Sequence, residues 1–184
     1  MARTRSGHPP AVIATAIALS LALLVGVVVA AVLAQRTSVT DALAVASVPA
    51  PDSDNPACAA LLAVLPEALG GSPRAALADP APAGAAAWMA TAAGGEQIVL
   101  RCGVPRPREF TRAAALVGVN GVQWLELPGA TRGIASTAYV AVDRAAYLAL
   151  TVPTGAGSGA LQQLSDVISA ALPRHDLDPA PVGG

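Results

Sequence analysis

The longest apolar stretch of the chain is residues 11–34, AVIATAIALSLALLVGVVVAAVLA, which carries no charge over 24 positions. As an α-helix this stretch would be about 36 Å long, and the hydrocarbon core of a bilayer is about 30 Å thick. The pattern therefore predicts a transmembrane helix, with the lipid bilayer as its partner.

The charges on the two sides of this stretch predict its orientation. Arg3 and Arg5 precede it, and Arg36 alone follows it before the first acidic residue. This bias favours a cytoplasmic N-terminus and a C-terminal domain outside the cell membrane. The alternative is secretion after signal-peptide cleavage, because Val32-Leu33-Ala34 and Ala44-Val45-Ala46 both fit a small-residue cleavage site, although a signal peptide's apolar region is typically about 7–15 residues long.

Two later segments have the pattern of helices. Asn55-Pro56 combines a good N-cap with a residue suited to the first helical position, and Pro66 stops or kinks the helix that follows. A second helix is predicted near 159–172, where apolar residues fall on one stripe. The stripe consists of Leu161, Leu164, Val167, Ile168, Ala171 and Leu172.

Runs rich in β-forming residues predict strands at 97–102 and 122–127, and alternation predicts a hairpin over 137–152. Residues 73–95 are predicted to be irregular, and 109–117 fit either helix or strand.

Within the hairpin, Val140 is expected opposite Leu148, across a three-residue loop. This register places six apolar side chains on one face and makes Tyr139 and Tyr147 diagonal neighbours on the other. The six are Ala138, Val140, Val142, Leu148, Leu150 and Val152.

Together these elements predict an α+β fold. It comprises an N-terminal transmembrane helix and one small extracytoplasmic domain, whose antiparallel or mixed sheet has about four strands with helices on one face. The predicted organisation is a cytoplasmic tail at 1–10, the transmembrane helix at 11–34, a linker at 35–55, the domain at 56–173 and a disordered tail at 174–184.

Composition narrows the possible functions. Hydrophobic residues make up 54% of the chain but include only five aromatics, so the core must be built from Ala, Val and Leu. Every cation is Arg, which excludes Schiff-base and lysine-base chemistry. The formal charge is −1, and the part beyond Arg3 and Arg5 is at −3. This acidic balance argues against nucleic acid as a partner.

Cys58 and Cys102 are the only cysteines of the chain, and both follow the apolar stretch. An even pair in an oxidising compartment predicts a disulfide, worth about 4 kcal/mol for a loop of this length. Two free buried thiols are the alternative. The hypothesis of a metal site has less support, because two cysteines without a nearby histidine pair do not provide the usual four ligands.

Several residues are candidates for a binding surface. Arginines crowd around two prolines and could contact anionic headgroups or an acidic wall polymer, or they could be a solvated loop. The two tryptophans could line a groove, although core packing is the commoner role in a small domain. The candidates are Arg101, Arg106, Arg108, Arg112, Trp88 and Trp124.

Other groups carry weaker chemical signals. His175 is the only histidine beyond the apolar stretch, and it lies in the predicted tail. The predicted domain therefore contains no histidine that could act as the base for a serine nucleophile. The glycine-rich residues 154–159 lack the lysine of a phosphate-binding loop and are interpreted as a connector. No catalytic residue, cofactor site or metal site is predicted.

The pieces of the chain together resemble a known family: actinobacterial envelope proteins, membrane-anchored or secreted, with a single domain of unknown function. The resemblance rests on five motifs: Cys58 with Leu65-Pro66, Trp88, LRCGVPRP at 100–107, GVQW at 121–124 and the helix ending at Leu172-Pro173. Met89 and Gln123 depart from the pattern, where a small residue and an acid are expected. The resemblance implies location and fold, not a reaction.

The sequence therefore predicts a non-catalytic, membrane-anchored binding or scaffolding module of the cell envelope, whose partner is an envelope protein or an anionic wall polymer. The alternatives are a carboxylate-based envelope hydrolase and a cleaved, secreted ligand-binding protein.

Overall fold

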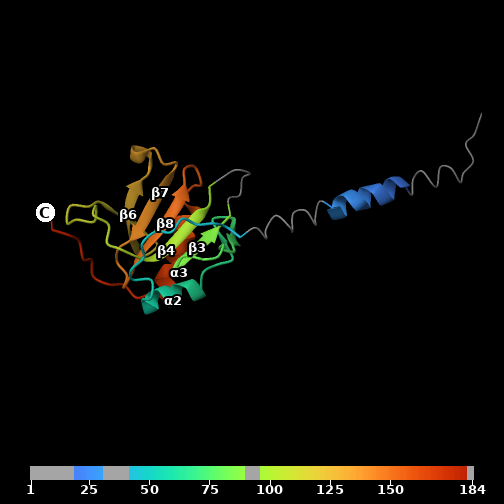
Figure 1. Ribbon diagram of the computed structural model, residues 1–184. Coiled ribbons are helices and arrows are strands. Elements are labelled where there is room, and N and C mark those ends of the chain that lie inside the picture. The colour runs from blue at the N-terminus through green and yellow to red at the C-terminus, as the bar shows by residue number, and fades with distance from the viewer. Residues whose placement is uncertain (1–18, 31–41, 90–95, 182–184) are drawn as a thin grey trace, which may run out of the picture. The chain divides into compact units, whose positions relative to one another are not determined.

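The computed structural model of the protein describes residues 19–30, 42–89 and 96–181 (Figure 1). The chain divides into two units, residues 1–41 and 42–184. In the first unit residues 19–30 are helical, and a helix of that length rises about 18 Å. None of the described helices is long and apolar enough to cross a membrane. The predicted fold class, with its transmembrane helix, is thus corrected; residues 11–18 and 31–34 lie outside the described part.

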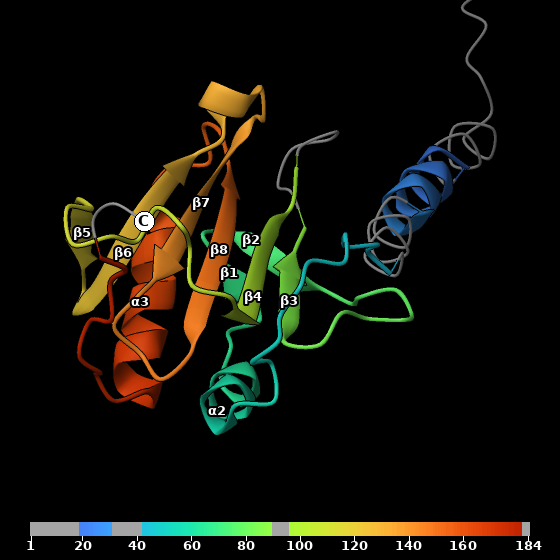
Figure 2. The ribbon, with the colours of Figure 1, turned by 60° about the vertical axis from the view of Figure 1, so that its left-hand side comes forward.

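The second unit is built on one antiparallel sheet of eight strands in the order β1-β2-β3-β4-β8-β7-β6-β5 (Figure 2). It consists of two meanders, β1 to β4 and β5 to β8, joined where β4 pairs with β8. The strands are β1 (Ala68–Leu69), β2 (Ser72–Ala75), β3 (Ala85–Trp88), β4 (Ile98–Val104), β5 (Leu116–Val119), β6 (Val122–Pro128), β7 (Ser136–Ala141) and β8 (Tyr147–Pro153). The expected number of about four strands was wrong.

The strands that the sequence did not predict are β1, β2, β3 and β5. The first three are made of Ala, Leu, Ser, Pro, Arg and Trp, a composition with little β-propensity. Strands β1 and β2 pair across a two-residue turn formed by Gly70 and Gly71, both of which have positive φ. Asn120 and Gly121, which also have positive φ, form a two-residue turn between β5 and β6.

The hairpin of β7 and β8 differs from its predicted register. Val140 pairs with Ala149, and Ala141 pairs with Leu148, so Val140 and Leu148 lie on opposite faces of the sheet. The connection is five residues, 142–146, rather than three. It is held by Asp143 and Arg144, whose side chains form a buried ion pair with Oδ2 and Nη1 2.8 Å apart. A shift of one residue moves every side chain of a strand to the other face.

The two helices of this unit begin and end close to their predicted bounds. Helix α2 (Pro56–Ala63) is capped by Asn55, whose Oδ1 accepts a hydrogen bond from the N–H of Ala57 at 3.0 Å. Helix α3 (Gly159–Ala171) buries the predicted stripe through Leu161, Leu164 and Ile168. A short 3-10 helix, η1 (Ala130–Arg132), lies between β6 and β7.

The sheet has a buried cluster on each face. The larger, on the face covered by α2 and α3, contains both cysteines, both tryptophans and the inward side chains of β4 and β8. The smaller lies on the helix-free face and consists of Val104, Phe110, Leu125, Val140 and Val142. One face is therefore sealed by helices, and the other is covered only in part.

Chain segments before and after the sheet also lie on it. In the predicted linker, Leu43 bridges to Leu77, and the N–H of Asp52 donates to Gly103. In the predicted disordered tail, the N–H of His175 donates to Asp143, and Ala180 forms a bridge with Thr111. Both segments therefore contribute backbone hydrogen bonds to the domain.

Candidate functional site

The two cysteines are joined, as predicted. The Cys58–Cys102 disulfide has a Cα–Cα distance of 5.5 Å and links α2 to β4 across 44 residues. Both residues are fully buried in the cluster beneath the helices. The bond therefore fixes α2 to the centre of the sheet, and no free cysteine is left.

Both candidate tryptophans lie in the core rather than on a surface. Trp88 and Trp124 are 0% exposed. The indole N–H of Trp88 donates to the carbonyl of Pro66 at 3.1 Å, and that of Trp124 donates to the hydroxyl of Ser165 on α3 at 3.0 Å. Each ring thus connects the sheet to the layer above it and offers no surface to a ligand.

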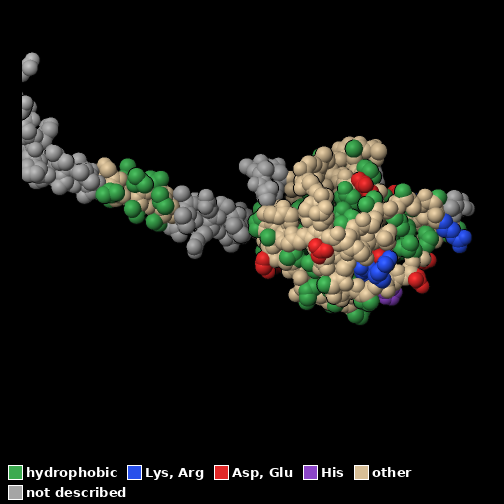
Figure 3. Space-filling view, turned by 180° about the vertical axis from the view of Figure 1, so that it is seen from behind, with side chains coloured by type: hydrophobic (Ala, Val, Ile, Leu, Met, Phe, Trp, Pro, Cys, Tyr) green, Lys and Arg blue, Asp and Glu red, His purple; other side chains and the backbone are tan. Residues whose placement is uncertain are grey.

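The four candidate arginines are divided between two places. Arg106 forms an ion pair with Asp178 at 3.1 Å, and the backbone N–H of Arg112 donates to Ala180, so both lie beside the C-terminal segment. Arg108 is exposed on the same loop. Arg101 lies on β4, where its side chain is half-buried on the helix-free face. Figure 3 shows charged side chains scattered over the visible face rather than gathered in one patch.

The tyrosines lie on opposite faces, contrary to the predicted register. Tyr139 packs against the cluster beneath the helices, whereas Tyr147 meets Phe110 edge-on, with ring centroids 6.3 Å apart. Partial burial raises the pKa of Tyr139, helped by the charge of Glu126 and a hydrogen bond to it. Burial also raises the pKa of Tyr147, with the charge of Asp178 adding to the rise and that of Arg106 opposing it.

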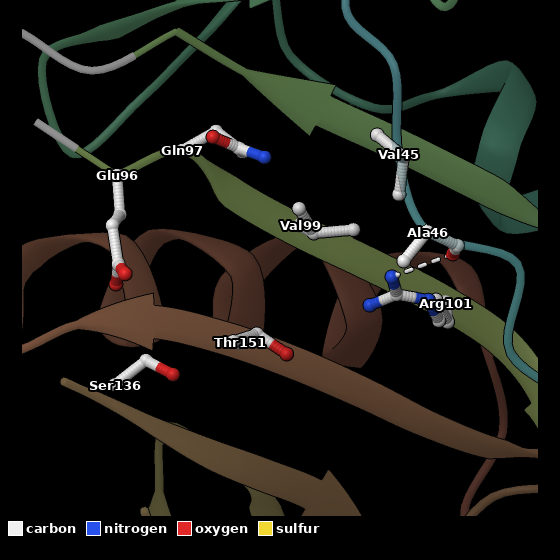
Figure 4. Close-up of a pocket in the computed structure, with 8 residues that line it drawn as sticks. All are labelled: Val45, Ala46, Glu96, Gln97, Val99, Arg101, Ser136 and Thr151. Atoms are coloured by element: carbon white, nitrogen blue, oxygen red, sulfur yellow. Dashed lines mark hydrogen bonds between the residues drawn. The ribbon is translucent and has the colours of Figure 1, made fainter. Parts of the chain in front are cut away.

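An open cavity of about 270 Å³ lies on the helix-free face, and we call it the Arg101 groove. Its floor comes from β4, β7 and β8, and its wall from the extended segment before α2 (Figure 4). The lining residues are Val45, Ala46, Glu96, Gln97, Val99, Arg101, Ser136 and Thr151. Of these, only Arg101 was a predicted binding-surface residue.

Arg101 is the charged group at one end of this groove. Its Nη2 donates to the carbonyl of Ala46 at 3.1 Å, while its buried Nε has no hydrogen-bond partner. Desolvation by burial lowers its pKa below the usual value. Among the described residues no carboxylate forms an ion pair with Arg101. The groove therefore contains a partly desolvated positive charge that no carboxylate of the described residues pairs with.

A second polar cluster, at the connection between β7 and β8, was also missed by the sequence analysis. The Asp143 and Arg144 side chains are each 1% exposed. Arg144 donates to the carbonyl of Gly121 at 3.1 Å, and Nε of Arg174 lies 3.5 Å from Asp143. This buried ion pair joins the β5–β6 turn to the C-terminal segment, and its role is to hold those segments together.

Metal-binding chemistry finds no support in the described part of the chain. Within residues 19–30, 42–89 and 96–181, no three His, Cys, Asp or Glu residues are grouped so as to hold an ion.

A protein-family model described as "Protein of unknown function (DUF3515)" matches residues 17–177. The chain belongs to this family. The matched region of this DUF3515 protein includes the disulfide, both tryptophans and every residue of the Arg101 groove. No curated protein and no solved structure matches the chain.

Proposed function

We propose that the DUF3515 domain is a non-catalytic binding or scaffolding module that works outside the cytoplasm, in an actinobacterial cell envelope. The observation that carries this proposal is the buried Cys58–Cys102 disulfide. Structural disulfides persist in oxidising compartments and are rare in the cytosol, where thiols are kept reduced.

The apolar sequence 11–34 supports the same location, because it provides a segment that can direct the chain to the membrane. Whether the segment stays attached or is removed decides between a membrane-bound and a secreted protein. Of the two candidate cleavage positions, the one after Ala46 would remove Leu43 and its bridge to Leu77. Cleavage after Ala34 leaves that docked segment whole, so it is the better candidate for a secreted form.

The binding role is supported by the Arg101 groove. Ligand sites are concave and present a few fixed polar groups, and this groove offers a guanidinium, two hydroxyls, an amide and a carboxylate. These groups come from three separate segments, at 96–101, at 136 and at 151, that the sheet holds in place, so the site is formed without a partner.

The test is the thiol state and mass of the full chain taken from intact cells. We expect both cysteines to resist alkylation until a reductant is added. A reporter that works only under oxidising conditions should be active when it is fused to the C-terminus. The mass should be two hydrogens below that of the reduced chain. Intact mass also separates the retained chain from one cleaved after Ala34. Thiols that alkylate directly in cells, together with an inactive reporter, would overturn the proposed location.

A further inference from the structure

We propose that the Arg101 groove binds a small ligand bearing a carboxylate or phosphate group, held by the Arg101 guanidinium. The inference rests on the proposed function of the domain as a binding module, and it names the ligand chemistry of that site. Three independent features of the groove support it: an unneutralised charge, a floor of small side chains, and polar groups distributed along its length.

The charge is the first feature. A half-buried guanidinium is normally paired with a carboxylate, because desolvation of an unpaired charge is unfavourable. The Arg101 side chain instead donates its hydrogen bond to a neutral carbonyl, that of Ala46. Arg74 makes the same kind of bond, to Leu65 at 3.2 Å, but it also lies over the ring of Trp88 at 6.0 Å and does not line the Arg101 groove. Arg101 thus has unused capacity for an oxyanion, which guanidinium groups bind strongly.

The floor is the second feature. Strand pairing places Val99, Thr151 and Ala138 in one row across β4, β8 and β7, and Arg101 and Ala149 in the next. On the helix-free face these side chains are short, so a ligand can approach the sheet closely beside the long Arg101 side chain. Elsewhere on that face, Phe110 and its neighbours fill the equivalent space.

The distribution of polar groups is the third feature. Figure 4 shows Glu96 and Arg101 at opposite ends of the groove, with Thr151 between them and Ser136 beside Glu96. A ligand with its anionic group at Arg101 would present its other end to a carboxylate and a hydroxyl, which favours hydroxyl or amino groups there. The volume of about 270 Å³ lies just below the usual range for ligand pockets, about 300–1,000 Å³, and suits a ligand about as large as one sugar or amino-acid unit.

The experiment is calorimetric titration of the oxidised full chain, purified in detergent micelles, with three matched sugars. Glucuronate carries a carboxylate, glucose 1-phosphate carries a phosphate, and glucose carries neither. We expect at least one anionic sugar to bind and glucose to bind about ten- to a hundredfold more weakly, the range for a hydrogen bond to a charged group. Which anion binds identifies the source of the oxyanion.

Variants show whether the binding depends on this groove. Arg101→Gln should weaken binding about ten- to a hundredfold, and Arg101→Lys should retain part of it. Arg74→Gln is the matched control, because it removes an arginine with the same carbonyl bond outside the groove, and binding should be unchanged. Since Arg101→Gln also removes the bond to Ala46, Thr151→Val provides a second test that leaves this bond intact, and it should weaken binding several-fold.

Three results would overturn the inference: no heat with either anionic sugar, equal binding of glucose, or equal loss of binding in Arg74→Gln and Arg101→Gln. These outcomes are separate from a failure of the proposed function. Reduced cysteines in cells would overturn the location and leave the titration unaffected, whereas a silent titration of oxidised protein would overturn the ligand assignment alone.

Discussion

The two faces of the sheet are built from the same eight strands but differ in how they are covered. Of the buried residues described, 21 belong to the cluster beneath α2 and α3, and five belong to the cluster on the helix-free face. The disulfide and both indole hydrogen bonds lie on the helix-covered side. The groove lies on the other side.

In the proposed binding module, this division separates stability from recognition. The chain has only five aromatic residues, and both of its tryptophans and its disulfide lie on the face where two helices exclude water. On the helix-free face the sheet is covered by extended segments and Phe110, which leaves polar side chains accessible between them. Substitutions of similar size should therefore have larger effects on stability on the first face than on the second.

The largest effect is expected from the disulfide. The double substitution of Cys58 and Cys102 by Ala should lower the free energy of unfolding by about 4 kcal/mol, because the open chain regains the entropy of a 44-residue loop. Denaturant unfolding with and without reductant measures this. Reduced wild-type protein is the control and should match the double variant, since the chain has no other cysteine. A loss below about 1 kcal/mol would show that the bond contributes little to the helix-covered face.

Truncating a leucine on each face tests the comparison with identical chemistry. Leu148→Ala opens a cavity beneath the helices at a residue that is 0% exposed, and it should reduce stability by about 4 kcal/mol, near the upper part of the range for buried leucines. Leu125→Ala, at a residue 4% exposed on the helix-free face, should cost about 2 kcal/mol because extended segments can collapse into the space.

Equal losses at the two leucines, or a larger loss at Leu125, would contradict the division between the faces. Chemical denaturation of both variants under the same oxidising conditions gives the two values directly.

A smaller effect is expected from the polar link between the sheet and α3. Ser165 accepts the indole N–H of Trp124 at 3.0 Å and donates to the carbonyl of Leu161 at 2.7 Å. Ser165→Ala leaves the buried N–H without a partner, which should reduce stability by about 1–3 kcal/mol. Ser169→Ala is the matched control, because its hydroxyl lies on the exposed part of the same helix. If the two substitutions reduced stability equally, the buried hydrogen bond between Trp124 and Ser165 would contribute no more than the exposed one.

Much of the helix-covered face could be predicted from the sequence. The cap at Asn55, the stripe of α3 and the pairing of the only two cysteines each depend on local signals or on counting. The predicted register of the β7–β8 hairpin was wrong for a physical reason. Asp143 and Arg144 are charged residues typical of a solvated loop, but they form a buried ion pair. Burial of that pair lengthens the connection to five residues and changes the register.

The helix-free face was much harder to predict, because its parts are distant in the sequence. The Arg101 groove combines residues near 45, 97, 136 and 151, which only the completed sheet brings together. A local signal did exist for the missed hairpin of β1 and β2, since Gly70-Gly71 between short strands is typical of a two-residue turn. Nothing comparable in the sequence predicts that residues 43–46 pack along the sheet.

The smallest effect concerns the two tyrosines, one on each face. Both have a pKa raised above the ordinary value of 10.0. Below pH 10.0 each tyrosine is protonated in both the folded and the unfolded chain. Between this pH and the raised pKa, the unfolded chain loses a proton that the folded chain still holds. The free energy of unfolding therefore falls as the pH rises through this range. Spectrophotometric titration of Tyr139→Phe and Tyr147→Phe reports the remaining tyrosine in each case, and both midpoints should exceed that of free tyrosine.

The causes of the two shifts differ, which allows each face to be perturbed alone. Glu126→Gln should lower the pKa of Tyr139 on the helix-covered face, because it removes the charge of Glu126 that opposes phenolate formation. It should leave Tyr147 unchanged. Asp178→Asn should lower the pKa of Tyr147 and leave Tyr139 unchanged, because it removes the charge of Asp178 that opposes formation of the Tyr147 phenolate. If either substitution moved both midpoints equally, the two faces would share one electrostatic environment, and the separation between the sealed and the accessible side of the sheet would not hold.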